Sequence, residues 1–100
     1  MAVDATFLAK VKTALRVSFT NTAIDNQISD LIEEAILDLT ATADIKPFTS
    51  ANADAYQQGA IIAYVSYKWF GEDKFLTSYN DMKTKMALSG SYGGGEADEE

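Results

Sequence analysis

The sequence contains neither cysteine nor histidine. The missing cysteines exclude disulfide bonds, and the two absences together remove the ligands on which the usual zinc sites depend. The commonest nucleophilic and acid–base groups of enzymes are absent for the same reason. The phosphate-binding loop GxxxxGKS or GxxxxGKT, the dinucleotide-binding pattern GxGxxG and the EF-hand pattern do not occur either. We therefore expect a protein that is not an enzyme and that has no cofactor and no metal.

Long apolar runs and an excess of positive charge are also missing. The longest uninterrupted apolar run, residues 60–65, is far shorter than the ~20 residues that cross a bilayer. The first residues lack the basic start and apolar stretch of a secretory signal peptide. The formal net charge is −7, from 8 basic and 15 acidic residues. Because affinity for nucleic acid depends on clustered lysine and arginine, we do not expect DNA to be tightly bound.

The first of four predicted helices begins at Asp4 or Thr6, either of which is suited to cap it. Its apolar side chains recur with helical spacing over about ten to thirteen residues. This pattern lapses at Ser18, so we expect the helix to end near Val17 or Ser18, with Phe19 folding back onto the bundle. Basic side chains lie outside the apolar arc, at Lys10, Lys12 and Arg16.

The second predicted helix has the clearest amphipathic pattern in the chain. It begins at Thr22 or Asp25, and apolar residues recur at i, i+4, i+7 and i+8 as far as Leu39. Its expected outer face carries the acids Asp30, Glu33, Glu34 and Asp38. Leu37 lies among these acids and is a candidate subunit contact, although a lone exposed leucine usually has no special role.

Proline occurs once, at Pro47, within the one long link that we expect to be irregular, residues 40–51. Ile45 and Phe48 are apolar enough to place this link on the bundle or on a neighbouring molecule. A link of this length in a small domain is often functional.

The third predicted helix, within residues 53–70, is apolar around most of its circumference and should be central, with neighbours on more than one face. Asn52 or Asp54 caps it, and Gly71 stops it. The fourth helix, residues 72–88, should pack through one seam while its charged side chains, Lys74, Asp81, Lys83 and Lys85, face solvent. The seam consists of Phe75, Tyr79, Met82 and Met86.

The pattern predicts an all-α fold, a small bundle of four helices with a central apolar third helix. Residues 1–89 form the helical domain, and residues 90–100 form a flexible, glycine-rich and acidic C-terminal tail. The first helix is basic outside and the second is acidic outside, which favours head-to-tail contacts between copies and hence rings. The predicted subunit-interface residues are Lys10, Lys12, Arg16, Asp30, Glu33, Glu34, Leu37, Asp38, Tyr64 and Tyr67.

Three segments carry a resemblance to a known family. The chain resembles the phage head–tail connector (adaptor) family of tailed bacteriophages in these segments. They are KVKTALRV at 10–17, IDNQISDLIEEAILDL at 24–39 and AIIAYVSYKWFGEDKFLTSYNDMKTKMALSGSY at 60–92. Members of this family are often labelled DNA-packaging proteins. The resemblance extends over residues 3–92 and consists of helix order and spacing, with no catalytic signature.

The resemblance implies a structural virion protein that forms a ring, expected to be dodecameric, beneath the portal protein. Such a ring extends the DNA channel and docks a head-closure or tail-completion protein, while DNA passes through without specific binding. It implies a location in the virion neck, and in the host cytoplasm during assembly, with no membrane. Family members engage the portal through their C-terminal segment, here Ser89, Gly90, Ser91 and Tyr92. The last acids, Glu96, Asp98, Glu99 and Glu100, are not part of the family pattern.

Two placements of the acidic face of the second helix remain open, either lining the ring lumen or facing Lys10, Lys12 and Arg16 of a neighbour. Two other functions remain open as well. A small helical phage regulator would bind a single protein partner and form no ring. A nucleic-acid-binding module would stack bases on the aromatic residues of the third helix, but only Lys68 lies among them. A helix-turn-helix made from the first two helices would place the second helix, with five acidic residues and no basic residue, in the major groove.

Overall fold

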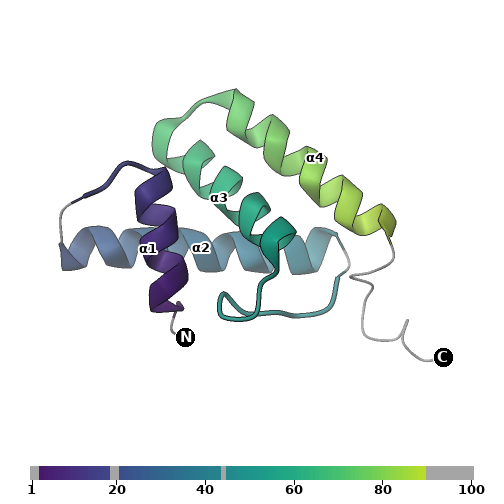
Figure 1. The fold of residues 1–100 in the computed structure, drawn as a ribbon. Coiled ribbons are helices and arrows are strands. Elements are labelled where there is room, and N and C mark those ends of the chain that lie inside the picture. The colour runs from purple at the N-terminus through teal and green to yellow at the C-terminus, as the bar shows by residue number, and fades with distance from the viewer. Residues whose placement is uncertain (1–2, 19–20, 44, 90–100) are drawn as a thin grey trace.

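The computed structural model describes residues 3–18, 21–43 and 45–89, which fold into an all-α bundle (Figure 1). Its helices are α1 (Ala5–Ala14), α2 (Thr22–Thr42), α3 (Ala55–Phe70) and α4 (Asp73–Ser89). The helices α3 and α4 form an antiparallel pair, and α1 and α3 both pack on the long helix α2. The predicted fold class, a small bundle of four helices, is confirmed. The predicted tail, residues 90–100, lies outside the described residues.

The most apolar helix, α3, is central because it packs against each of the other three helices. Ala60, Ile61 and Val65 are fully buried in it. The side chains that enclose these residues are also fully or almost fully buried, and they come from every other helix: Phe7, Val11, Ile28, Ile32, Ala35, Leu39, Tyr79 and Met86. The prediction that α3 needs neighbours on several faces is therefore confirmed.

The helix starts are set by local capping interactions. Asp4 Oδ2 accepts a hydrogen bond from Phe7 N (3.0 Å), which confirms the predicted cap of α1. At α3, Asp54 Oδ1 accepts from Gln57 N (2.8 Å) and Gln57 Oε1 accepts from Asp54 N (3.0 Å), a reciprocal capping box. The cap of α2 is Asn21, whose Oδ1 accepts from Ile24 N, so the helix begins at Thr22.

The helix α1 ends at Ala14, earlier than the predicted end near Val17 or Ser18. Arg16 stops it by adopting a left-handed backbone conformation, with φ 64°. The carbonyls of the last turn are then satisfied by backward hydrogen bonds, from Val17 N to Lys12 O (2.9 Å) and from Arg16 N to Thr13 O (3.1 Å). This pattern is a Schellman motif, which usually has glycine at the left-handed position. Phe19 lies outside the described residues.

The helix α2 continues to Thr42, into the segment predicted to be an irregular link. The helix accommodates its threonines because their hydroxyls bond to carbonyls one turn earlier. Thr40 Oγ1 donates to Ile36 O (2.8 Å), and Thr42 Oγ1 donates to Asp38 O (2.7 Å). The irregular link therefore comprises only the residues between α2 and α3.

The link lies on the chain's own bundle. Ile45 is buried and Phe48 is half-buried, and both pack against the core. Ser50 Oγ accepts a hydrogen bond from Asp4 N (2.8 Å), which joins the link to the start of α1. Of the two predicted positions for this link, the structure shows the one on the bundle.

Candidate functional site

Six polar side chains on three helices share one spacing, four residues, which places each pair on one helix face. Two carboxylates lie on α2, and a tyrosine followed by a lysine lies on each of α3 and α4. We call this set the polar layer: Glu34, Asp38, Tyr64, Lys68, Tyr79 and Lys83.

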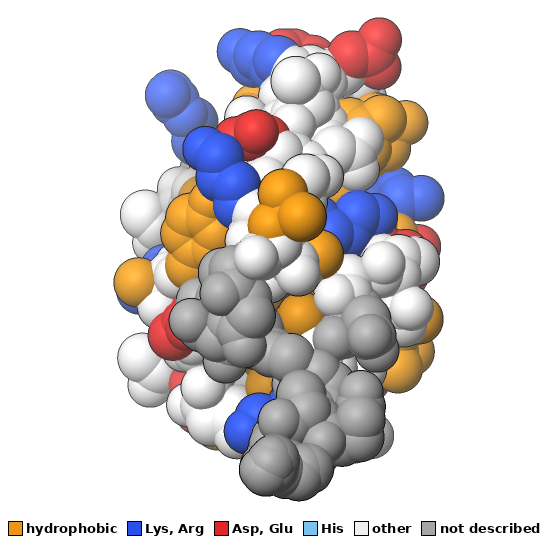
Figure 2. Space-filling model, turned by 90° about the vertical axis from the view of Figure 1, so that its right-hand side faces the viewer, with side chains coloured by type: hydrophobic (Ala, Val, Ile, Leu, Met, Phe, Trp, Pro, Cys, Tyr) orange, Lys and Arg blue, Asp and Glu red, His pale blue; other side chains and the backbone are white. Residues whose placement is uncertain are grey.

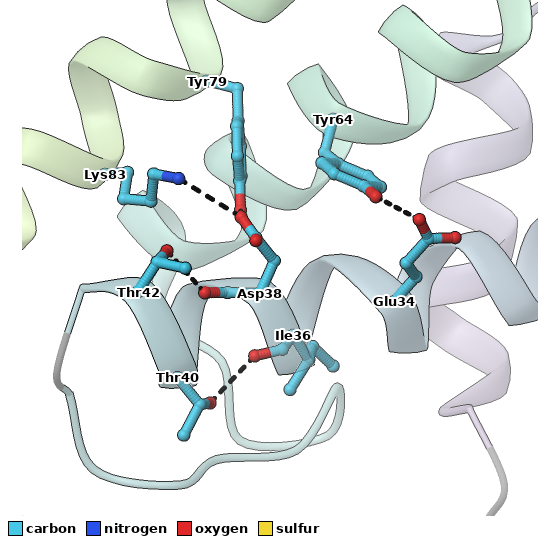
Figure 3. A network of polar contacts seen from close by, with 8 residues as sticks. All are labelled: Glu34, Ile36, Asp38, Thr40, Thr42, Tyr64, Tyr79 and Lys83. Atoms are coloured by element: carbon cyan, nitrogen blue, oxygen red, sulfur yellow. Dashed lines mark hydrogen bonds and ion pairs between the residues drawn. The ribbon is translucent and has the colours of Figure 1, made fainter.

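The first half of the polar layer joins α2 to α3. The Tyr64 hydroxyl donates a hydrogen bond to Glu34 Oε2 (Figure 3). Lys68 Nζ lies 3.7 Å from the same carboxylate oxygen and 5.6 Å from the centre of the Tyr64 ring. The ammonium group therefore attracts both the carboxylate and the ring face.

The second half joins α2 to α4 and is better shielded from solvent. The Tyr79 hydroxyl donates to Asp38 Oδ2, and Lys83 Nζ lies 3.3 Å from that oxygen (Figure 3). Lys83 Nζ is also 5.0 Å from the centre of the Tyr79 ring. The rings of Tyr64 and Tyr79 meet edge to face, with centroids 5.1 Å apart, so the two halves form one continuous layer.

Both tyrosines remain protonated donors in this environment. Burial, followed by the hydrogen bond to Glu34, raises the pKa of Tyr64 well above its ordinary value. Burial and the hydrogen bond to Asp38 raise the pKa of Tyr79 still further. Ionised tyrosine would lie beside a carboxylate in a poorly hydrated place, which explains the direction of both shifts. The polar layer therefore holds α3 and α4 against α2 at neutral pH.

Two predictions about surface charges are corrected by the polar layer. Glu34 and Asp38 do not belong to an outer face of α2 with Asp30 and Glu33, because they turn toward tyrosines of α3 and α4. Lys83 does not lie on the solvated side of α4, since it is half-buried and paired with Asp38. The spacing of four residues was visible in the sequence, but which helices would face one another was not.

The basic residues predicted on α1 are mostly occupied within the chain. Lys10 Nζ donates to Gln58 Oε1 (2.8 Å), and Lys12 Nζ lies 2.8 Å from Asp25 Oδ1 in a largely shielded ion pair. Arg16 is exposed and has no ion pair within the described residues. Of these three candidates, Lys12 alone has its charge paired with a carboxylate, and Arg16 alone makes no side-chain hydrogen bond or ion pair within the described residues.

The side of α2 opposite the core carries the other available groups. On a helical wheel at about 100° per residue, Asp30 and Leu37 point almost directly away from the buried Ile28 and Ile32. Leu37 is 69% exposed, and Asp30 is exposed without an ion pair within the described residues. Glu33, beside them, is half-buried, and its buried Oε2 accepts no hydrogen bond. We call Asp30, Glu33 and Leu37 the outer face of α2.

The remaining predicted contacts differ in accessibility. Tyr64 is buried in the polar layer, and Tyr67 is half-buried on α3. Ser89 is the last residue of α4, while Gly90, Ser91 and Tyr92 lie outside the described residues. Leu88, one residue before the end of α4, is 80% exposed, a feature that the sequence pattern did not single out.

Within the described parts of the chain, no group of three or more acidic, histidine or cysteine side chains is arranged to hold a metal ion. No helix in these parts is long and apolar enough to cross a membrane. Comparison of the chain with family models, with curated proteins and with solved structures finds no match.

Proposed function

We propose that this chain is the subunit of a phage head–tail connector, a structural virion protein that forms a ring beneath the portal. The ring would extend the DNA channel and dock a head-closure or tail-completion protein. The resemblance over residues 3–92 supports the proposal, because the family has an all-α subunit and this chain folds as one. The observation that carries it is the outer face of α2, where an exposed leucine lies among acids that have no ion pair within the described residues.

The surface charge is compatible with a channel through which DNA passes. On the face drawn in Figure 2, basic and acidic side chains are interspersed, and no broad basic patch is formed. Five lysines are paired with carboxylates of the same chain, which lowers their capacity to hold phosphates: Lys12, Lys68, Lys74, Lys83 and Lys85. A conduit of this kind would let DNA move without gripping it.

The test is the mass of the full chain in solution, alone and mixed with purified portal rings, by sedimentation velocity and native mass spectrometry. We expect a ring-sized species alone, or a collar that adds a whole number of subunits to each portal ring. A chain that stays monomeric with several different portals would contradict the proposal. The alternative function, a helical regulator with a single partner, would then be pursued by one-to-one binding measurements.

A chain without the last eleven residues, 90–100, provides a second arm of this test. If the C-terminal segment engages the portal, this variant should lose the collar while its helical content is retained. An acidic protein of similar size serves as the control for nonspecific charge attraction, because the chain carries a net charge of −7 and a collar formed by negative charge alone would also take up that protein. A collar that forms equally well without residues 90–100 would remove the portal-docking role from Gly90, Ser91 and Tyr92.

A further inference from the structure

Arg16 occupies a position at which most residues are unfavourable. Its φ of 64° is the left-handed conformation, which glycine adopts freely and residues with a Cβ adopt at a cost. The side chain is exposed and makes no ion pair or hydrogen bond within the described residues that would offset this cost. Strained residues of this kind often have a role beyond folding.

Most charged side chains of the described residues are paired within the chain, and few have no partner. Lys10 is bound to Gln58, and five other lysines have carboxylate partners, so Arg16 and Lys46 are the cations without a partner in the described residues. Among the acids of the described residues, Asp30, Glu33 and Asp73 take part in no ion pair, and the first two lie together on α2. Glu33 in particular has a buried oxygen without a hydrogen bond within the described residues, so its carboxylate is not compensated there.

Arg16 makes no ion pair with Asp30 or Glu33 within the described residues. The contact between Lys12 and Asp25 shows on which flank of α2 the helix α1 lies. The helices α1 and α3 pack on α2 (Figure 1). The helical wheel places Asp30 and Leu37 on the side of α2 opposite its buried residues. Arg16 therefore leaves the outer face of α2 without a cation in the described part of the same chain.

We infer that Arg16 of one copy binds the outer face of α2 on a second copy, at Asp30 and Glu33 beside Leu37. The inference rests on the proposed function and names the contact between ring subunits. An exposed apolar residue flanked by complementary charges is a common arrangement in interfaces. Because the two contacting faces differ, the contact is head-to-tail, and it closes into a ring or continues as a filament according to the rotation between copies.

The test uses charge-swap variants of the full chain. Arg16→Glu and the double variant Asp30→Lys/Glu33→Lys each place like charges at the contact, so each alone should lose self-association by at least tenfold. A one-to-one mixture of these two variants restores opposite charges at every contact, and so does one chain that carries all three substitutions. We expect association to return in both cases. Lys46→Glu is the matched control, because it reverses the other unpaired cation and should leave association unchanged.

Association is measured by sedimentation equilibrium and native mass spectrometry, both alone and on portal rings, and circular dichroism verifies that each variant is folded. Collars that form normally with Arg16→Glu would overturn this inference and leave the proposed function intact. Restored association in the mixture, with no collar on any portal, would support the inference and contradict the proposed function. A wild-type chain that is monomeric in both settings would overturn both.

Discussion

At the residue scale, Arg16 and Gly71 show two ways to end a helix. Both have a left-handed backbone, with φ 64° and 75°, but Gly71 has no Cβ to strain. We predict that Arg16→Gly is more stable than Arg16→Ala by ~1 kcal/mol, because both lose the charge and only glycine is relaxed at that position. Urea denaturation of the two variants measures the difference. Equal stabilities would show that the left-handed conformation costs little here.

Tyr79 illustrates the value of a buried hydrogen-bond donor. We predict that Tyr79→Phe lowers the free energy of unfolding by ~1–3 kcal/mol. The substitution removes the hydroxyl donor of Asp38, a partly buried carboxylate, and leaves Lys83 as its remaining partner. Tyr67→Phe is the matched control: its hydroxyl has no hydrogen bond within the described residues, so the change should stay within ~0.5 kcal/mol. Similar losses in the two variants would mean that the hydroxyl of Tyr79 contributes nothing specific.

At the element scale, the turn between α3 and α4 depends on Gly71. An alanine Cβ at this position would meet no atom within 4 Å, so the cost of Gly71→Ala is the backbone conformation alone. We predict a loss of ~1 kcal/mol in the free energy of unfolding, measured by urea denaturation. Gly59→Ala is a useful comparison, since that glycine lies within α3 with ordinary φ and its Cβ would touch only Met82, with Sδ at 3.5 Å and Cε at 3.9 Å. A larger loss at Gly59 than at Gly71 would contradict this account.

The attachment of α4 to α2 should weaken at alkaline pH. The pKa of Tyr79 is raised in the folded chain above its unfolded value of ~10, so its contribution to stability is complete below pH ~10. Above that pH the unfolded chain releases the proton while the folded chain retains it. The free energy of unfolding should then fall by as much as ~1.4 kcal/mol per pH unit.

The measurement is urea denaturation at several pH values between 9 and 11, in the wild type and in Tyr79→Phe. Lysines titrate in both proteins, so the difference between the two slopes isolates the tyrosine. We expect a shallower slope in Tyr79→Phe. Parallel slopes would indicate that Tyr79 ionises in the folded chain as readily as in the unfolded one.

At the scale of the whole molecule, the packed core lies well inside the helical domain. Among the described residues, the buried side chains lie between Phe7 and Met86. We predict that a chain of residues 1–89 has the same urea midpoint as the full chain, with ~0.5 kcal/mol or less between them, because all the buried side chains of the described core are retained. Deletion also removes Glu96, Asp98, Glu99 and Glu100, so the net charge changes from −7 to −3. A clearly lower midpoint would show that residues 90–100 pack on the domain.

Much of the fold could be predicted because the relevant signals are local. The caps Asp4 and Asp54 and the stop at Gly71 act within one helical turn, so neighbouring residues reveal them. The end of α1 was predicted too late because arginine does not signal a left-handed stop as glycine does. The end of α2 was predicted too early because threonine is typical of links, whereas here Thr40 and Thr42 bond back to their own helix.

The amino-acid sequence by itself determined the number of helices, their order and the central place of α3, since apolar periodicity decides which side of each helix must leave water. Only the tertiary structure decided how the polar arc of α2 is divided. Asp30, Glu33, Glu34 and Asp38 look alike on a single helix, yet α3 and α4 bring hydroxyls to Glu34 and Asp38 alone. The physical reason is that hydrophobic burial specifies one side of a helix, while the partners of its polar side chains depend on where other helices pack.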